Sequence, residues 1–565
     1  MPYRAPISEY AFVLTHVAGF SAVQSTERFC DCTNDLMDAI LAEAGKLCEE
    51  TLAPLNRVAD KVGSRIENGV VTTPPGFIAA YRQIAEGGYV GMGGDPAFGG
   101  LGLPMALVSA VNEMMGSACL ALQLNPLMAQ GQIEALEHHA SDAIKALYLP
   151  RLISGEWSAT MNLTEPQAGS DVGALRTRAE NLGDGTYAIT GQKIYITWGE
   201  HDLTQNICHL VLARLANAPA GTKGISMFMV PKFIPNADGS LGARNGARAI
   251  SLEHKLGLHG APTAVMAYDR ATGWLVGAEN KGMAAMFTMM NNARLGVAIQ
   301  GIAIAEAATQ AATDYALSRT QGRTPFGETA IIDHADVRRM LGQMRAEAFA
   351  ARAIALTCAV AIDMARATGD AAWAARAAFL TPIAKAYGSD IGAEVAHMCV
   401  QVHGGMGVIE DTGVAQFCRD VRVTSIYEGT NGIQALDLVG RKMADGGAVA
   451  LALMDEMAEV AAQAGNDLGG ALGHAIEALS AATQVLLAQD AQDRAAGAVG
   501  YLRAFARVLG ASLHLKAALA DLARRPLAAF YIQRLLPEHT ALLAQAKVGA
   551  KGLYDLDADA LGLRD

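Results

Sequence analysis

The stretch SIYEGTNGIQALDLVGRK, residues 425–442, contains a carboxylate, Glu428, in a turn directly before a predicted helix. Glu428 is flanked by the aromatic residue Tyr427 and by Gly429. A carboxylate beside an aromatic ring and a small residue can be desolvated, which raises its pKa into the working range of a general base. Taken alone, Glu428 is explained better as a surface residue that the helix dipole stabilises. The rest of the chain must therefore decide between the two interpretations.

The helix is predicted to begin after Thr430, because apolar residues then recur at helical spacing. These apolar residues are Ile433, Leu436 and Val439. Asn431 and Gln434 have the spacing of a capping box at the start of this helix.

The regions on either side of this stretch differ in the sequence patterns that predict helices and strands. Residues 446–565 read as an additional Ala-rich helical region, with a stripe at Leu472, Ile476, Leu479, Thr483 and Leu486. Long Ala/Leu/Met helices, four or five of them, precede the stretch and predict a bundle over 279–445. Short alternating runs such as YAITGQKIYIT (187–197) predict a small antiparallel β domain over 158–278. Residues 1–157 read as helices again.

Bulk composition excludes several classes of protein. The net charge of −12 over 565 residues argues against a nucleic-acid partner. The eight cysteines form no CxxC pair, so we expect no metal site and no disulfide framework, but reduced, mostly buried thiols in a cytoplasmic protein. The first twelve residues lack the apolar region of a signal peptide. The apolar run 353–362 is too short to span a bilayer, and we expect no membrane partner.

Two segments of the predicted β domain carry groups suited to a flavin. MNLTEPQAGSDVGALRT (161–177) offers small residues whose backbone N–H groups and hydroxyls can bond a flavin ring edge or a pyrophosphate. KIYITWGE (193–200) is predicted as an alternating strand. Tyr195 and Thr197 share one side, and Ile194, Ile196 and Trp198 share the other. AGSD alone is better explained as a plain strand-connecting turn, although the full TEPxAGSD string is long and specific. KIYITWGE alone is equally well explained as an ordinary half-buried strand.

Two further segments carry groups suited to phosphate and adenine. In YALSRTQGRTPFG (315–327), Arg319 and Arg323 follow a helix and precede Phe326, which suits a pyrophosphate beside a stacked adenine. Alone, such a segment is more simply a basic helix end. In QVHGGMGVIED (401–411), glycines allow close approach of a ligand, and Gln401 can bond a phosphate or ribityl oxygen. His403 in this segment is expected to be structural rather than catalytic.

Together, in this order and at these spacings, the strings TEPxAGSD, K-x-Y-I-T, R-x-x-F-G, Q-x-x-GG-x-G and IYEGT resemble the acyl-CoA dehydrogenase flavoprotein family. The resemblance covers roughly residues 35–443, including FGGLG (98–102), and extends into the C-terminal tail. It implies a mainly α fold with a central β domain. The expected parts are an N-terminal helical domain, a small antiparallel β-barrel, a C-terminal four-helix bundle and an extra C-terminal helical domain.

The resemblance also implies the cofactor, FAD, and a role for each matching residue. Glu428 removes the α proton of an acyl-CoA thioester, and the β hydrogen leaves as hydride to the flavin. The FAD contacts implied within one subunit are Met161, Leu163, Thr164, Gly169, Ser170, Tyr195, Thr197, Thr430 and Asn431. Those implied from a neighbouring subunit are Arg319, Arg323, Phe326, Gln401, Gly404 and Gly405. The substrate contacts implied are Ser170, Arg294, Tyr427 and Gly429.

Three departures from the family pattern leave points open. Four residues are inserted between Tyr315 and the Phe-Gly pair, so either Arg319 or Arg323 can be the phosphate ligand. Trp198 replaces the small or amide residue usual in its position, and Asn291 stands where an Asp is common. None of these changes removes Glu428.

The opening MPYRAPISEYAFVL and the strings SRTQGR and GEHDL resemble the subgroup of the family that acts on 3-methylmercaptopropionyl-CoA in sulfoniopropionate breakdown. This resemblance implies electron-transfer flavoprotein as the acceptor. Because the tail is expected to cover the face that smaller members use to form a tetramer, a homodimer is expected. The alternatives are a general short- to medium-chain acyl-CoA dehydrogenase, an acyl-CoA oxidase, and a flavin-bound nucleic-acid-associated protein.

Overall fold

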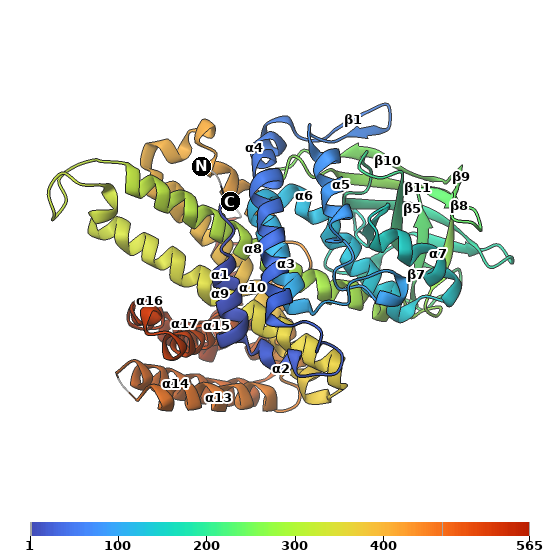
Figure 1. Ribbon diagram of the computed structural model, residues 1–565. Helices are drawn as coiled ribbons and strands as arrows, with labels where there is room; N and C mark the ends of the chain where they lie inside the picture. The colour runs from blue at the N-terminus through green and yellow to red at the C-terminus, as the bar shows by residue number, and fades with distance from the viewer. Residues whose placement is uncertain (1–2, 466, 564–565) are drawn as a thin grey trace. The chain divides into compact units, whose positions relative to one another are not determined.

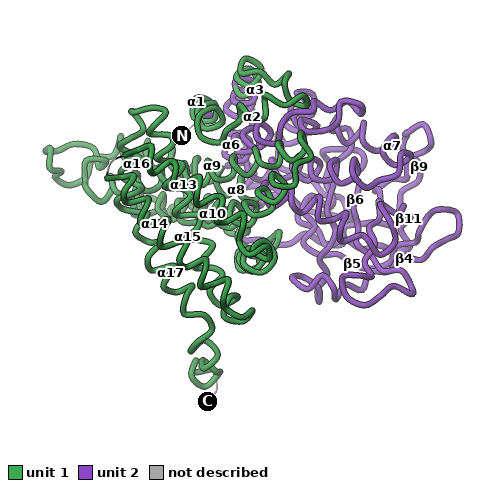
Figure 2. The backbone as a smooth tube through the Cα atoms, turned by 90° about the horizontal axis from the view of Figure 1, so that it is seen from below, with its two compact units in different colours: residues 1, 6–41, 297–565 green, residues 2–5, 42–296 purple. Residues whose placement is uncertain are grey.

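The computed structural model describes residues 3–465 and 467–563, and the chain divides into two compact units (Figure 2). Unit 1 takes in residues 6–41 together with the chain from residue 297 onward, and unit 2 takes in residues 42–296 with a short N-terminal piece. The predicted division into four domains, with edges near 157, 278 and 445, stays a prediction.

The first half of unit 2 is helical, as Ala-, Leu- and Met-rich sequence favours. Its helices are α4 (Ala53–Val62), α5 (Phe77–Glu86), α6 (Met105–His139) and α7 (Asp142–Ile153), and a short hairpin joins β1 (Arg65–Glu67) to β2 (Val70–Thr72). Nearly all of α6 is buried, which its continuous apolar sequence requires.

The second half of unit 2 is a small β-barrel (Figure 1). Its strands are β3 (Trp157–Asn162), β4 (Arg178–Asn181), β5 (Tyr187–Thr197), β6 (Asn206–Arg214), β7 (Ile225–Pro231), β10 (Ala247–Leu252) and β11 (Thr263–Val276). The pairings β11–β5, β5–β4, β4–β6, β6–β7 and β7–β11 close a ring around a core that includes Ile189, Val211 and Phe228. The separate hairpin of β8 (Phe233–Pro235) and β9 (Leu241–Arg244) stands outside this ring.

Two details of the barrel differ from the prediction. The sheet is mixed rather than antiparallel, because β6 pairs in parallel with β3 and, at one position, with β4. The alternation of β5 is interrupted at Tyr195, whose φ of +61° accompanies a register shift in its pairing with β11. This bulge leaves Tyr195 exposed beside the half-buried Ile194, so the predicted two-sided pattern holds only from Ile196 onward.

The named elements in the described residues of unit 1 are all helices, joined by loops. At its N-terminal end lie α1 (Ile7–Phe12), a π-helical turn (Val13–Ala18), α2 (Phe20–Gln24) and the start of α3 (Asn34–Leu47). The bundle contains α8 (Gly282–Ser318), which begins in unit 2, with α9 (Ala335–Thr368), α10 (Ala371–His403), α11 (Val414–Val421) and α12 (Asn431–Asp437). The bundle therefore has three long helices, completed by short ones.

The C-terminal tail is helical, as predicted. Its helices are α13 (Ala448–Ala464), α14 (Asp467–Ala488), α15 (Ala491–Ala520), α16 (Arg525–Phe530) and α17 (Glu538–Val548). All five residues of the predicted stripe in α14 are buried. Within unit 1, α15 packs against α9, α10 and α12.

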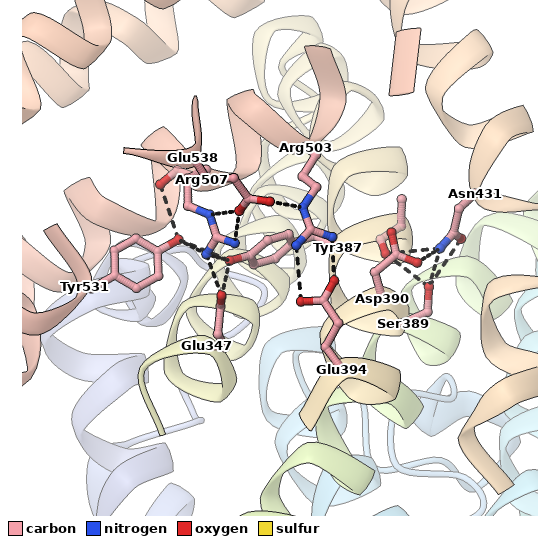
Figure 3. A network of polar contacts seen from close by, with 11 residues as sticks. Glu347, Tyr387, Ser389, Asp390, Glu394, Asn431, Arg503, Arg507, Tyr531 and Glu538 are labelled. Carbon is pink, nitrogen blue, oxygen red and sulfur yellow. Dashed lines mark hydrogen bonds and ion pairs between the residues drawn. The ribbon is translucent and has the colours of Figure 1, made fainter. Parts of the chain in front are cut away.

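A buried polar network joins α15 to the bundle (Figure 3). The Arg507 guanidinium donates to Glu347 Oε1 at 2.6 Å and also pairs with Glu538. The hydroxyl of Tyr387 donates to Glu347 Oε2 at 2.6 Å. Four residues earlier on α15, Arg503 pairs with Glu394 of α10 and with Glu538. The tail is thus attached to the bundle by ion pairs as well as by apolar contacts.

By length and composition alone, α6, α8, α9 and α14 could each cross a membrane. The apolar run 353–362 thus belongs to a longer apolar window in α9 than the sequence suggested. In α6, α8 and α9 this window is 89–94% buried within the protein, so packing accounts for its apolarity; in α14 the buried share is 39%.

Candidate active site

The turn that carries Glu428 ends where α12 begins. Thr430 is the N-cap residue, and its hydroxyl accepts a hydrogen bond from the backbone N–H of Ile433 at 3.3 Å. The capping-box pairing suggested by Asn431 and Gln434 is therefore wrong. Gln434 Nε2 instead reaches back past the cap and donates to the backbone carbonyls of Glu428, at 3.0 Å, and Gly429, at 3.3 Å.

The backbone of this turn is left-handed at two successive residues. Glu428 has a φ of +56° and Gly429 a φ of +81°. Glycine adopts this region freely, whereas a residue with a Cβ adopts it at a cost of about 1–2 kcal/mol. Such a residue persists only where its surroundings fix it, and these residues cluster at active sites. Glu428 as a residue is half-buried.

Tyr427, the aromatic neighbour of Glu428, is tied to α8. Its hydroxyl donates to the side-chain oxygen of Gln300. Desolvation raises the pKa of Tyr427 above its ordinary value, and the nearby Glu428 carboxylate acts in the same direction. The phenol is therefore a neutral donor at any physiological pH.

Most of the remaining predicted site residues of unit 1 are exposed. This exposed group comprises Arg319, Arg323, Phe326, Gln401, Gly404 and Gly405. Arg319 Nη2 donates to Gln321 at 3.2 Å. A Cβ added at Gly404 or Gly405 would meet nothing within 4 Å, so these glycines leave open space beside the backbone.

Asn431 differs from that group, because its amide is used within the protein. Its Nδ2 donates to Asp390 Oδ1 at 2.6 Å and to Ser389 Oγ at 3.0 Å, and its Oδ1 accepts from Lys385 Nζ at 2.8 Å (Figure 3). His403 also has partners within the protein: its Nδ1 lies 2.8 Å from the Cys399 carbonyl, its ring stacks on Tyr315, and burial lowers its pKa.

In unit 2, the predicted flavin-facing residues bring together hydroxyls without protein partners. Among the described residues, the hydroxyls of Thr164, Ser170, Tyr195 and Thr197 form no hydrogen bond. Leu163 is buried, Met161 half-buried and Gly169 exposed. Partly exposed hydroxyls beside apolar side chains match the chemistry of an isoalloxazine, which has polar edges and an apolar face. The residues present therefore fit FAD.

A buried ion pair supports this loop, and the sequence interpretation missed it. Lys193 Nζ donates to Glu165 Oε1 at 2.9 Å and to the Leu163 carbonyl at 2.8 Å. Glu165 also accepts from the backbone N–H groups of Arg176 and Thr177. Burial alone raises the pKa of Glu165, but Lys193 and these donors outweigh it and lower that pKa to about 2. Burial lowers the pKa of Lys193 to about 8, while Glu165 acts in the opposite direction.

The bonding of Glu165 predicts an acid-labile loop. A carboxyl whose pKa falls from 4.5 to about 2 on folding stabilises the folded state fully above pH 4.5, and this contribution is lost as the pH falls toward 2. We expect the free energy of unfolding to decrease over that window, and Glu165→Gln to flatten the decrease. Urea titrations from pH 6 to pH 3 measure both. An unchanged slope in Glu165→Gln would contradict this assignment.

Two other carboxylates could have competed with Glu428 as the base. Glu165 is held as a low-pKa anion by Lys193, which makes it a poor proton acceptor. Glu410 is exposed and pairs with Arg419 at 3.0 Å. Neither lies in a strained turn, so Glu428 keeps the strongest structural case.

Arg294, the predicted contact for the CoA end of the acyl channel, is buried in unit 2. Its Nη1 donates to Asn291 Oδ1 at 3.4 Å, and its guanidinium lies 5.9 Å from the ring centre of Phe287.

The barrel, the bundle and the carboxylate turn define a flavoprotein of the acyl-CoA dehydrogenase class, and comparison with known proteins agrees. Family models match residues 35–156 (acyl-CoA dehydrogenase, N-terminal domain), 160–271 (middle domain), 280–444 (C-terminal domain) and 453–557 (acetyl-CoA dehydrogenase C-terminal like). The chain belongs to the acyl-CoA dehydrogenase family and is an FAD-dependent oxidoreductase.

One relative resembles the chain over almost its whole length. The 3-methylmercaptopropionyl-CoA dehydrogenase of Ruegeria pomeroyi is 45% identical, over 89% of this chain and 88% of its own. Two solved structures share the fold. Caenorhabditis elegans ACDH-11 in complex with C11-CoA has a TM-score of 0.79 at 18% identity, over 98% of this chain and 96% of its own. An acyl-CoA dehydrogenase from Bacillus anthracis complexed with FAD has a TM-score of 0.75 at 19% identity, over 94% and 91%.

Proposed function

We propose that this enzyme oxidises 3-methylmercaptopropionyl-CoA to the corresponding trans-2-enoyl-CoA, with Glu428 as the base. The observation that carries the substrate assignment is the 45% identity to the Ruegeria pomeroyi enzyme, because the match covers 89% of this chain and so reaches beyond the catalytic domains into the tail. A general short- to medium-chain acyl-CoA dehydrogenase is the alternative.

In the proposed reaction Glu428 takes the α proton of the thioester, and its own backbone N–H donates to the thioester carbonyl. Tyr427, Gly429, Ser170 and Arg294 contact the substrate. FAD, when bound, accepts the β hydrogen as hydride. The left-handed backbone at Glu428 supports this dual role, since it lets one residue present both a side-chain carboxylate and a backbone donor.

The proposed FAD contacts follow the chemistry of the groups that the chain presents. Met161, Leu163, Thr164, Gly169, Ser170, Tyr195 and Thr197 contact the flavin, together with Thr430 and Asn431. Arg319 or Arg323, with Phe326, Gln401, Gly404 and Gly405, contact the adenine and pyrophosphate of a neighbouring subunit's FAD. The unbonded hydroxyls of unit 2 and the open space at Gly404 and Gly405 support this assignment.

Because the adenine contacts come from a neighbour, the active enzyme is proposed to be a homodimer. Exposed apolar side chains on these segments support an interface: Phe326 is 72% exposed and Val408 70%. We expect light scattering of the FAD-loaded enzyme to give the mass of a dimer. A monomer that retains FAD would contradict the proposal.

The substrate is tested by comparing kcat/KM across a panel of acyl-CoA thioesters. The panel contains 3-methylmercaptopropionyl-CoA, butyryl-CoA, octanoyl-CoA and palmitoyl-CoA. We expect the thioether substrate to be preferred, with butyryl-CoA next because it has nearly the same length. A preference for palmitoyl-CoA by several decades would refute the assignment, and equal use of butyryl- and octanoyl-CoA would favour the general dehydrogenase.

The acceptor is tested in the same assay. Electron-transfer flavoprotein is the proposed acceptor, and the enzyme is proposed to be cytoplasmic. We expect turnover with this flavoprotein or an artificial acceptor and little peroxide in air. Rapid peroxide formation with oxygen alone would identify an acyl-CoA oxidase. Salt-sensitive DNA binding without thioester turnover would identify the nucleic-acid-associated class, against which the net charge of −12 argues.

A further inference from the structure

The two peptide units that follow the α-carbon of Glu428 are held by side chains rather than by helix or sheet. The Glu428 carbonyl accepts from Gln434 Nε2 at 3.0 Å. The Gly429 carbonyl accepts from Lys385 Nζ at 2.9 Å and from Gln434 Nε2 at 3.3 Å. Lys385 of α10 and Gln434 of α12 therefore hold the turn by hydrogen bonds from two different helices.

Lys385 is an unusual residue for this position. It is fully buried on α10, in a run that is otherwise apolar or small, LTPIAKAYGS (380–389). A buried ammonium is costly unless its donors are satisfied. Two of its hydrogen bonds go to the turn and the start of α12, to Gly429 and to Asn431 Oδ1 at 2.8 Å. The hydrogen bonds that offset the cost of burying the Lys385 ammonium therefore depend on the geometry of the segment that carries Glu428.

The helix that bears Lys385 is itself fixed. One turn further along α10, Ser389 and Asp390 hold the other side of the Asn431 amide (Figure 3). Tyr387 and Glu394 of the same helix bond Arg507 and Arg503 of the tail. A positioning group must itself be immobile to be effective, and these contacts in the part of α10 that follows Lys385 hold the helix in place.

We propose that Lys385 and Gln434 are positioning residues for the base. They hold the two carbonyls after Glu428 so that the strained φ of +56° is maintained and the carboxylate keeps a single orientation. The inference rests on the proposed role of Glu428. Without the hydrogen bonds from Lys385 and Gln434, the turn would relax toward an ordinary right-handed or extended backbone. The carboxylate of Glu428 would then move away from its position relative to the substrate.

The test uses the FAD-loaded, full-length enzyme and compares Lys385→Met, Gln434→Met and Glu428→Gln. Methionine keeps the length of each side chain but removes its donors. Arg352→Met is the matched control, because Arg352 is an equally buried cation of unit 1 that bonds Glu306 of α8 at 2.7 Å. The readouts are FAD content, the rate of anaerobic flavin reduction at saturating 3-methylmercaptopropionyl-CoA or butyryl-CoA, and KM.

We expect Lys385→Met to retain FAD and to reduce its flavin on the order of 10²-fold more slowly, as a misplacement of about 1 Å can do. Its KM should change little, since the lost contact acts in the transition state. Gln434→Met should show a smaller loss of the same kind. Arg352→Met should melt at a lower temperature yet reduce its flavin at the wild-type rate per bound FAD.

The outcomes distinguish a failure of the positioning role from a failure of the proposed function of Glu428. If Glu428→Gln is inactive while Lys385→Met and Gln434→Met react at the wild-type rate, the positioning role is wrong and the base assignment stands. If Glu428→Gln is itself active, the base assignment fails, and the positioning role fails with it. A rate loss in Arg352→Met equal to that in Lys385→Met would show a general effect of losing a buried cation and overturn the inference. Should Lys385→Met not fold, the rate of Gln434→Met decides.

Discussion

Glu428→Gln is expected to bind FAD as the wild type does and to lose turnover by about 10⁴-fold or more. The amide keeps the shape of the side chain, and the proposed FAD contacts lie elsewhere. The α proton of a thioester is weakly acidic even when its carbonyl is polarised, and a neutral amide cannot accept it. Loss of a positioned base typically costs about 10²–10⁴-fold, and coupling to hydride departure places this case at the upper end. Flavin bleaching by substrate under anaerobic conditions measures the loss.

Glu410→Gln is the matched control for this substitution. Glu410 lies 18 positions earlier and is an exposed residue that pairs with Arg419 at the surface, so its loss should change the rate little. If Glu428 were merely a dipole-stabilising residue, Glu428→Gln would cost under about 1 kcal/mol of stability and leave rates normal. Bleaching of Glu428→Gln at the wild-type rate would therefore refute the mechanism.

Arg507→Met is expected to be the most destabilising of the substitutions considered, by about 3–5 kcal/mol. Burial alone lowers the pKa of Arg507, but the surrounding phenols and carboxylates raise it well above its ordinary value, so the guanidinium is charged. Glu347, its partner, is fully buried, and burial raises the pKa of that carboxyl. Removing the cation leaves Glu347 with the Tyr387 hydroxyl but without a compensating charge. Thermal melting and denaturant titration of the FAD-loaded enzyme measure the effect.

Arg503→Met provides the comparison for Arg507→Met. Arg503 lies one turn away on the same helix and bonds Glu394 and Glu538, but these side chains are 23% to 36% exposed, so solvent screens the pairs. Its loss should cost about 1 kcal/mol or less. Adding Glu347→Leu to Arg507→Met should recover part of the stability, because no buried charge then remains. Equal destabilisation by Arg503→Met and Arg507→Met would show that burial does not determine how much each arginine contributes to the free energy of unfolding.

Periodicity predicted the type of each element, because one chain segment displays its side-chain spacing by itself. The buried stripe of α14 and the existence of a β domain follow from such spacing, whereas the closed barrel was implied only by the resemblance to the acyl-CoA dehydrogenase family. The mixed pairing of β6 with β3 could not be read in this way, because strand order depends on partners far along the chain. The bulge at Tyr195 was missed for a similar reason: its register is set by β11 rather than by β5.

The sequence predicted chemical groups for the candidate site, but not the residues that hold those groups in place. Motif residues such as Glu428 and Ser170 lie in turns where short strings carry the information. The supporting cations, Lys193 and Lys385, lie in strands and helices, and their partners are 28 and 44 positions away. A weak signal was present, since each is a lone lysine among apolar or small residues, but sequence alone does not distinguish a buried lysine from one at the surface. Gln434 was assigned to the cap because Thr430 had not been recognised as the competing N-cap.

The N-terminal helices of unit 1 impose an order on how the chain can be assembled during its synthesis. Glu9 bonds Arg524 at 2.9 Å, 515 positions later, and Lys516 Nζ donates to the Val17 carbonyl at 2.7 Å. At ribosomal speeds of about 5–20 residues per second, residues 6–41 wait roughly half a minute to two minutes for these partners. The core of unit 2, residues 42–296, is continuous and can fold meanwhile. Residues 6–41 therefore leave the ribosome long before the C-terminal residues that bond them.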